Sequence, residues 1–302
     1  MLEPLRRALP CAAAWLAVRD PETGRHRPVG RYGDTEALAR YFTLPDADEE
    51  LQQFGMNRRR PAVRASDVPV PLPETLAWGE YLLPAGYRNG VAVGVFAEDG
   101  RHLGFITLLS DDPASLTVEH RDLLGRLRPL VARALDRLPS LAAFGRHTGD
   151  ALGAAVVTRG GRCLPVPGLP RHPLLLPGSP VLTVARAHAG TPGARSTFLC
   201  PTTGGLVGIT VLDCRDESTD HLSALVLVRP AEDTWGLRPM ELRILGAQLE
   251  GWDDERISAC CGVPWDAARA EELAHRMGFG TVHALLLGVA RAGRYVPPAL
   301  WP

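Results

Sequence analysis

The stretch LRPMELRILGAQLEGWDDERISACCGV, residues 237–263, decides the fold of the C-terminal part of the chain. Leu242, Leu245 and Leu249 recur at the spacing that places side chains on one face of an α-helix. Gly251 follows, and glycine most readily takes the left-handed conformation that ends a helix. The pattern predicts a short amphipathic helix that stops before a second helix begins.

Capping residues and glycines repeat this pattern further along the chain. Asp253, Asp266 and Thr281 can each accept a hydrogen bond from the first turn of a helix, and Gly262 and Gly278 can end the second and third helices. We therefore expect four short helices, with a tight turn between the second and third, as in a helix-turn-helix. The side chains expected to face inward from the last three helices are Ile257, Cys260 and Cys261, then Ala270, Leu273, Ala274 and Met277, then Val282, Leu285, Leu286 and Val289.

Residues throughout this segment match a known pattern, residue for residue over its first half. They are Leu237, Pro239, Glu241, Leu242, Ile244, Leu245, Glu250-Gly251, Ile257, Gly262-Val263, Met277-Gly278-Phe279 and Ala284. In these residues the sequence resembles the DNA-binding domain of LuxR-family transcription regulators. The resemblance implies a helix-turn-helix fold whose third helix reads DNA.

The second half of the segment departs from that family. Pro264-Trp265 replaces the usual small hydroxyl cap and polar residue, and the part from there to Thr281 is shorter by about one helical turn. The third helix holds Arg269 and Arg276 against three acidic residues, and the whole module has seven arginines against eight acidic residues. DNA affinity depends on neutralising phosphates, so this charge disfavours DNA binding.

Four residues are candidates for contact with DNA, and each also has a simpler interpretation. Cations on an exposed helix can bind phosphates or base edges, but they can equally be solvated surface residues of a module that does not bind DNA. Both interpretations stay open for Arg256, Arg269, His275 and Arg276.

A β-hairpin is the clearest signal in the N-terminal region. Val91, Val93 and Val95 alternate along one strand, Asp99-Gly100 favours a tight turn, and residues 103–109 return as a second apolar strand. A further pair of strands is expected at residues 11–18 and 28–32, and a helix after Asp34.

A long helix is expected to follow the hairpin. Thr117 can cap it, and Pro129 stands inside it. The apolar stripe consists of Leu123, Leu127, Leu130 or Val131, Ala134 and Leu138. With this hairpin and helix, residues 10–138 resemble a GAF domain, which implies an antiparallel sheet that senses a small molecule or forms a dimer.

Four aromatic residues are candidates to line a ligand pocket in this region, because ligand sites are apolar with a few polar groups. They are Trp78, Tyr81, Tyr87 and Phe96. Core packing explains these four aromatic residues equally well.

A cluster of arginines lies in a polar, proline-rich stretch, residues 46–73. It consists of the arginines at 58–60 and Arg64, and indicates either an anion site or a charged loop.

Residues 139–230 are expected to form a second, smaller sheet. Strands are predicted at residues 151–158, 163–166, 198–200, 206–213 and 222–228, and six prolines between positions 165 and 180 indicate a rigid connector. A small sheet with such a crossing segment resembles a reduced PAS domain. The sequence thus predicts a multidomain α+β protein with a GAF-like domain at 1–140, a PAS-like domain at 145–230 and an all-α helix-turn-helix domain at 236–302.

Composition excludes several kinds of chemistry. The 302-residue chain has a net charge of −1 and contains no lysine, so it has no phosphate-loop or Schiff-base lysine. We find no dinucleotide loop, no nucleophile elbow and no metal-ligand spacing, and we expect no metal and no cofactor. The six cysteines form no CxxC pair and are expected to be reduced and mostly buried. A thiol-based reductase acting through Cys11 is the enzyme alternative, although Cys11 begins a predicted buried strand.

Localisation follows from the lack of a long apolar run. Residues 8–18 are apolar after two arginines, but Pro10 interrupts them, and no run approaches the roughly 20 residues of a membrane helix. We expect a cytoplasmic protein that does not enter a membrane.

Two functions remain open. The first is a bacterial one-component transcription regulator, in which a small-molecule or protein signal shifts the population of a DNA-binding homodimer. The second is an interaction or dimerisation protein that keeps the LuxR-type module without binding DNA.

Overall fold

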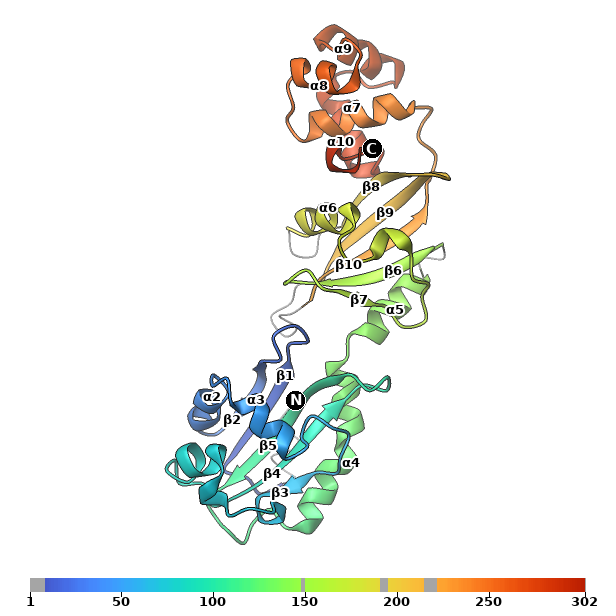
Figure 1. The fold of residues 1–302 in the computed structure, drawn as a ribbon. Helices are drawn as coiled ribbons and strands as arrows, with labels where there is room; N and C mark the ends of the chain where they lie inside the picture. Colours follow the sequence, from blue (N-terminus) through green and yellow to red (C-terminus); the bar gives the residue numbers. More distant parts are fainter. Residues whose placement is uncertain (1–8, 148–149, 191–194, 215–221, 302) are drawn as a thin grey trace. The chain divides into compact units, whose positions relative to one another are not determined.

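A computed structural model describes residues 9–147, 150–190, 195–214 and 222–301 of the chain. The chain forms two compact units, Met1–Arg137 and Leu138–Pro302. Each unit contains a five-stranded antiparallel sheet, and helices follow the second sheet within its unit (Figure 1). This confirms the predicted α+β class with two antiparallel sheets, whereas the three domain boundaries stay a prediction.

The first sheet consists of β1 (Ala13–Arg19), β2 (His26–Tyr32), β3 (Val63–Arg64), β4 (Asn89–Phe96) and β5 (His102–Ser110). Its strand order is β2-β1-β5-β4-β3. β4 and β5 form the predicted hairpin, with Asn89 opposite Ser110. Gly100 in the turn has a φ of +88°, a conformation that glycine adopts without strain. β1 and β2 pair as expected, with Ala14 opposite Tyr32.

Helices cover both faces of this sheet, because alternate residues of its strands are buried on opposite sides. Ile106 and Leu108 of β5 pack with Leu124 of α4 (Val118–Leu135) on one face. Phe105 and Leu109 pack on the other face, with three short helical segments. These segments are α2 (Glu36–Tyr41), α3 (Ala47–Gln53) and a π-helical segment (Ala77–Leu82).

The buried stripe of α4 differs from the expected one. Leu124 and Val131 are buried, whereas Leu130 is 60% exposed and Ala134 is also exposed. The face turned toward the sheet is thus centred about one residue later than predicted, and α4 ends before Leu138, which belongs to the next helix. The leucine spacing alone did not fix this rotation, because leucines also lie on the border of the buried face.

The second sheet consists of β6 (Gly153–Thr158), β7 (Cys163–Pro165), β8 (Arg195–Thr202), β9 (Gly205–Asp213) and β10 (Leu222–Pro230). Its strand order is β7-β6-β10-β9-β8, and all neighbouring strands are antiparallel. The five predicted strands of this region are therefore confirmed, within a few residues at their ends.

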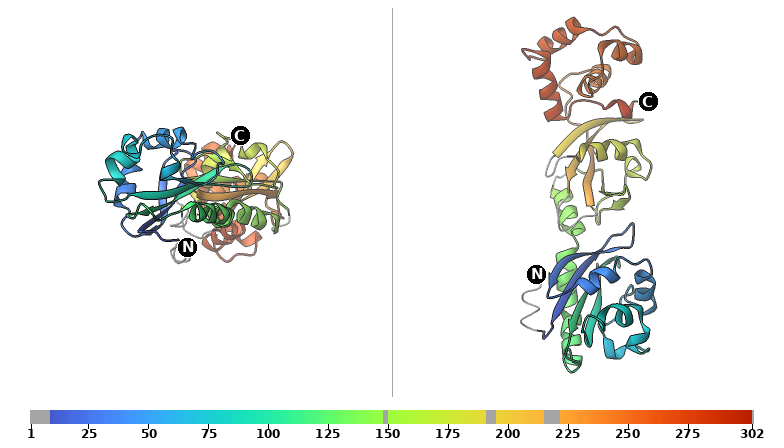
Figure 2. Two further views of the ribbon diagram at one scale, coloured as in Figure 1. Left: turned by 90° about the horizontal axis from the view of Figure 1, so that it is seen from below. Right: turned by 90° about the vertical axis from the view of Figure 1, so that its left-hand side faces the viewer.

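Two helices lie on opposite faces of the second sheet (Figures 1 and 2). α5 (Leu138–His147) packs on Val156, and α6 (Pro180–His188) packs on Val157. The predicted proline connector precedes α6, and only its last proline, Pro180, belongs to the helix. Pro180 stands in the first turn of the helix, where no intrahelical N–H donor is needed, so proline is compatible with helix formation there.

The four C-terminal helices follow the predicted pattern. They are α7 (Pro239–Leu249), α8 (Asp254–Cys261), α9 (Ala267–Arg276) and α10 (Val282–Ala292). The side chains of Asp253, Asp266 and Thr281 accept hydrogen bonds from the first turns of the last three helices. Gly262 and Gly278, at the ends of α8 and α9, have positive φ angles of 65° and 77°.

The cysteines are less buried than expected. All six are described, and of these Cys200 is buried while Cys260 is exposed. On α8 the buried seam runs through Ile257 to the half-buried Cys261, because this helix packs mainly on α7. Cys260 therefore turns away from the core instead of facing it.

The helices α7, α9 and α10 share one hydrophobic core with the second sheet, whereas α8 packs through Ile257 on α7. Phe198 and Leu199 of β8 belong to the same buried cluster as Leu242 of α7 and Val289 of α10. Directly after α10, the carbonyl of Tyr295 accepts a hydrogen bond of 2.8 Å from the backbone N–H of Leu199. The helical module is thus docked on the edge strand β8.

Candidate functional site

An apolar cavity of about 100 Å³ lies between the first sheet and the helices on one of its faces. Its floor comes from β4 and β5, and α2, α3 and the π-helical segment cover it. Nearly all of its lining is apolar. Its lining includes the side chains of Phe42, Glu50, Trp78, Ala92, Phe105 and Thr107.

A buried carboxylate holds the cover of this cavity together. Glu50 on α3 accepts hydrogen bonds from the backbone N–H groups of Leu76 at 2.6 Å and Ala77 at 3.0 Å. It also accepts one from the Tyr41 hydroxyl at 2.7 Å. Burial and this hydrogen bond raise the pKa of the Tyr41 phenol, so it remains a donor. Glu50 thereby ties α3 to the start of the π-helical segment.

The four predicted pocket residues are not gathered at one site. Trp78 lines the cavity. Tyr81 packs its ring 6.0 Å from that of Tyr41, and the Tyr87 hydroxyl donates to the carbonyl of Asp34. The Phe96 ring stacks on His102 at 4.7 Å. The last three thus take part in packing elsewhere in the unit.

Sequence reasoning missed the polar residues and several rings of the cavity. Glu50 lies in the stretch interpreted as loop with short elements, and its backbone partners are 26 and 27 positions away. Thr107 sits among apolar residues of a predicted strand. In a strand, Phe105 and Thr107 lie on the same face, but nothing in the sequence indicates that this face is hollow. Arg64 reaches the cavity rim, where its guanidinium pairs with Asp67 at 2.8 Å.

The corner between α8 and α9 is the second candidate site. The Ser258 hydroxyl accepts a hydrogen bond of 2.8 Å from the backbone N–H of Trp265 and donates to the carbonyl of Asp254 at 2.7 Å. With the left-handed Gly262, these bonds fix the turn that leads into α9. The backbone of Trp265 is therefore held by the preceding helix, while its indole N–H is buried without a hydrogen-bond partner among the described residues.

Of the predicted DNA contacts, Arg269 lies beside this corner and Arg256 in the first turn of α8, whereas His275 and Arg276 lie at the far end of α9. The three arginines all have intramolecular contacts. Arg276 donates to Glu241 at 2.6 Å, and Arg269 donates to the carbonyl of Pro264 at 2.5 Å. The Arg256 guanidinium lies 3.7 Å from the centre of the Trp252 ring. The fourth candidate, His275, is exposed on α9. These contacts neither require nor exclude a role in DNA binding.

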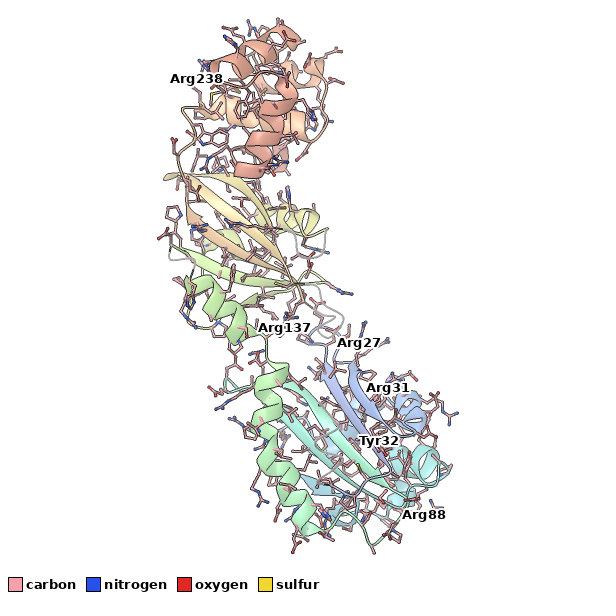
Figure 3. The ribbon with its side chains drawn as sticks, turned by 180° about the vertical axis from the view of Figure 1, so that it is seen from behind. Arg27, Arg31, Tyr32, Arg88, Arg137 and Arg238 are labelled. Carbon is pink, nitrogen blue, oxygen red and sulfur yellow. The ribbon has the colours of Figure 1, made fainter. Side chains whose placement is uncertain are left out.

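Glu241 is the centre of a charged group between α7 and α9. Its side chain is 8% exposed and accepts hydrogen bonds from Arg276 and Arg238. Arg238, which is labelled in Figure 3, is itself 73% exposed. Burial alone would raise the pKa of Glu241, but the hydrogen bonds from Arg238 and Arg276 outweigh it, so the pKa is lowered. A concavity of about 560 Å³ opens beside this group and is also lined by Arg269 and Glu272.

The described part of the chain offers neither a metal site nor a membrane-spanning helix. No group of three His, Cys, Asp or Glu side chains there is arranged to hold a metal ion. Among the same residues, no helix is long and apolar enough to cross a bilayer.

No protein-family model matches the sequence, and no curated protein matches it either. Solved structures give distant matches. A domain of a two-component sensor histidine kinase protein from Sinorhizobium meliloti 1021 is 15% identical, with a TM-score of 0.35 over 48% of this chain and 92% of that one. A red/green cyanobacteriochrome is 19% identical, with a TM-score of 0.35 over 46% and 91%. Vibrio cholerae VqmA, described as a LuxR-type receptor, is 16% identical, with a TM-score of 0.28 over 54% and 92%. The chain is thus distantly similar in structure to sensor proteins, and these scores do not by themselves indicate its function.

Proposed function

We propose that the chain is a sensor-type transcription regulator and not an enzyme. Unit 1 receives a small-molecule or protein signal, and the helices α8 and α9 bind DNA in a homodimer. The observation that supports this best is the corner at Gly262, where two capped helices meet in a tight turn held by Ser258. This is the local geometry that presents one helix to a DNA groove.

The charge on α9 sets the expected strength of binding. At 100° per residue, the side chains opposite the buried Ala270, Leu273 and Ala274 are Ala268, Glu272 and His275. An acidic residue at the centre of a reading face repels phosphates, and fewer cations release fewer counterions. We therefore expect affinity that is modest and sensitive to salt.

DNA binding by the full-length protein tests this proposal. Selection from a random duplex pool should enrich one sequence, and fluorescence anisotropy should then show at least tenfold weaker binding of that sequence by Arg269→Ala. Arg291→Ala is the matched control, since it removes the same charge from the exposed surface of α10 and should have a smaller effect. The double variant Glu271→Gln/Glu272→Gln should bind more tightly at low salt. If the selection enriches no sequence, the proposal is contradicted.

A second candidate function is a docking or dimerisation module without DNA binding. It is favoured by the bonds that hold Arg276 on Glu241 and Arg269 on Pro264, which reduce the cations available to phosphates. Leu287 on α10 is 44% exposed and is a suitable apolar contact for a second copy. If Leu287→Glu shifts the sedimentation coefficient from dimer to monomer while the protein binds no DNA, this function replaces the first.

A further inference from the structure

We propose that the cavity in unit 1 binds a neutral molecule of a single ring that has one hydrogen-bonding substituent. This inference rests on the proposed sensor function and names the chemical class of its signal. Three properties of the cavity lead to it: its size, the state of its charged groups and the hydroxyl on its floor.

The size of the cavity sets the size of the ligand. A cavity of about 150 Å³ is known to hold one benzene molecule, so a volume of about 100 Å³ is too small for more than a single ring. Pockets for nucleotides and other drug-sized ligands are several times larger. The rings of Phe42, Trp78 and Phe105 line the cavity, and aromatic side chains favour a flat apolar ligand.

The charged groups of the lining exclude a charged ligand. The Glu50 carboxylate already accepts three hydrogen bonds from Tyr41, Leu76 and Ala77. The Arg64 guanidinium is bonded twice to Asp67, at 2.8 Å and 3.3 Å. A charge buried without a partner costs several kcal/mol or more, so carboxylic acids and amines are disfavoured in their charged forms.

One polar side chain on the floor of the cavity, that of Thr107, remains for the ligand. Thr107 is in the middle of β5, between Phe105 and Leu109 on the face that forms the floor. Within the described residues, no group donates to its hydroxyl or accepts from it. The Thr75 hydroxyl, by contrast, already donates to the carbonyl of Leu72 at 2.9 Å. A hydroxyl or carbonyl on the ring can therefore pair with Thr107.

Calorimetry and ligand-observed NMR on the full-length protein, without DNA, test this inference with four probes. Phenol has the proposed size and group, toluene lacks the hydrogen-bonding group, benzoate is charged, and 2-naphthol has a second ring. Phenol should bind about fivefold more tightly than toluene, the ratio expected from one net hydrogen bond. Benzoate and 2-naphthol should show no binding at the same concentrations.

Two variants connect binding to the cavity. Thr107→Val keeps the side-chain shape and should make phenol and toluene bind equally, while bound toluene shows that the cavity is intact. Ala92→Leu adds three carbons to the floor and should abolish the binding of both. The inference is overturned if benzoate or 2-naphthol binds as tightly as phenol, or if Thr107→Val leaves the phenol preference unchanged.

The failure of this inference can be told apart from the failure of the proposed function. Phenol that binds as described without changing DNA affinity would refute the coupling to DNA and leave the ligand class standing. DNA binding by a protein that binds none of the probes would refute the ligand class alone.

Discussion

Replacing Gly293 by alanine should separate the helical module from the sheet on which it is docked. Gly293 follows α10 with a φ of +67°, and an added Cβ atom would lie 2.6 Å from the Cβ of Thr197 on β8. Real Cβ atoms do not approach this closely, so either the backbone after α10 or β8 must move. The substitution thus combines backbone strain with a steric clash.

The magnitude can be divided between these two causes by a matched control. Gly262 has nearly the same φ, +65°, but an added Cβ would have no heavy atom within 4 Å. Gly262→Ala should therefore cost only the left-handed strain of about 1–2 kcal/mol. Gly293→Ala should cost about 1–3 kcal/mol more, the usual penalty for overpacking a filled core.

Two measurements check this result. Denaturant unfolding of the full chain gives the free energy of unfolding for both variants. Hydrogen exchange at the Leu199 N–H, which bonds to the Tyr295 carbonyl, reports the docking directly. Gly293→Ala should accelerate exchange at Leu199, and Gly262→Ala should not. Equal losses of stability with unchanged exchange at Leu199 would refute the docking of the module on β8.

Three further predictions concern titratable groups. Burial, then the charges of His102 and Arg19, lower the pKa of His26 to about 3, and burial lowers that of His102 to about 4. Between about pH 6.5 and these values the unfolded chain binds more protons than the folded chain, so the free energy of unfolding should fall as the pH falls. Denaturant unfolding measures this, and a free energy of unfolding that stays constant from about pH 7 to 4.5 would contradict it. Cys260 is exposed, whereas burial raises the pKa of Cys200 to about 11, so mass spectrometry should find iodoacetamide on Cys260 well before Cys200. Glu241→Ala removes the contact that caps α7 and the partner of two arginines, so the free energy of unfolding should fall by about 1–3 kcal/mol. Thermal unfolding should therefore show a lower midpoint temperature, and an unchanged midpoint would argue against the capping contact.

Local patterns predicted the local structure well. The caps at Asp253, Asp266 and Thr281 act within three residues of the N–H groups that they bind, so the sequence alone determines them. The same holds for the left-handed glycines, such as Gly262, and for the hairpin around Gly100. These features need only neighbours along the chain, and their residue types are distinctive.

Contacts between distant residues were decided only by the tertiary structure. Glu50 bonds to backbone groups 26 and 27 residues away, and Arg276 bonds to Glu241 across 35 residues. Neither pairing has a local signal, because acidic and basic residues are common on every surface. The sequence could thus identify the basic residues that are candidates for DNA contact, but not the side chains and carbonyls with which they pair in the fold.

The stretch from residue 237 to 263 determined by itself that two short helices follow one another and that the second ends at a glycine turn. It could not determine that the module shares a core with β8, because Phe198 and Val289 meet only when the sheet and the last helix are both formed. The cavity is also a tertiary feature. An empty volume arises from how strands and helices pack at a distance, and no single stretch of sequence encodes what the packing leaves unfilled.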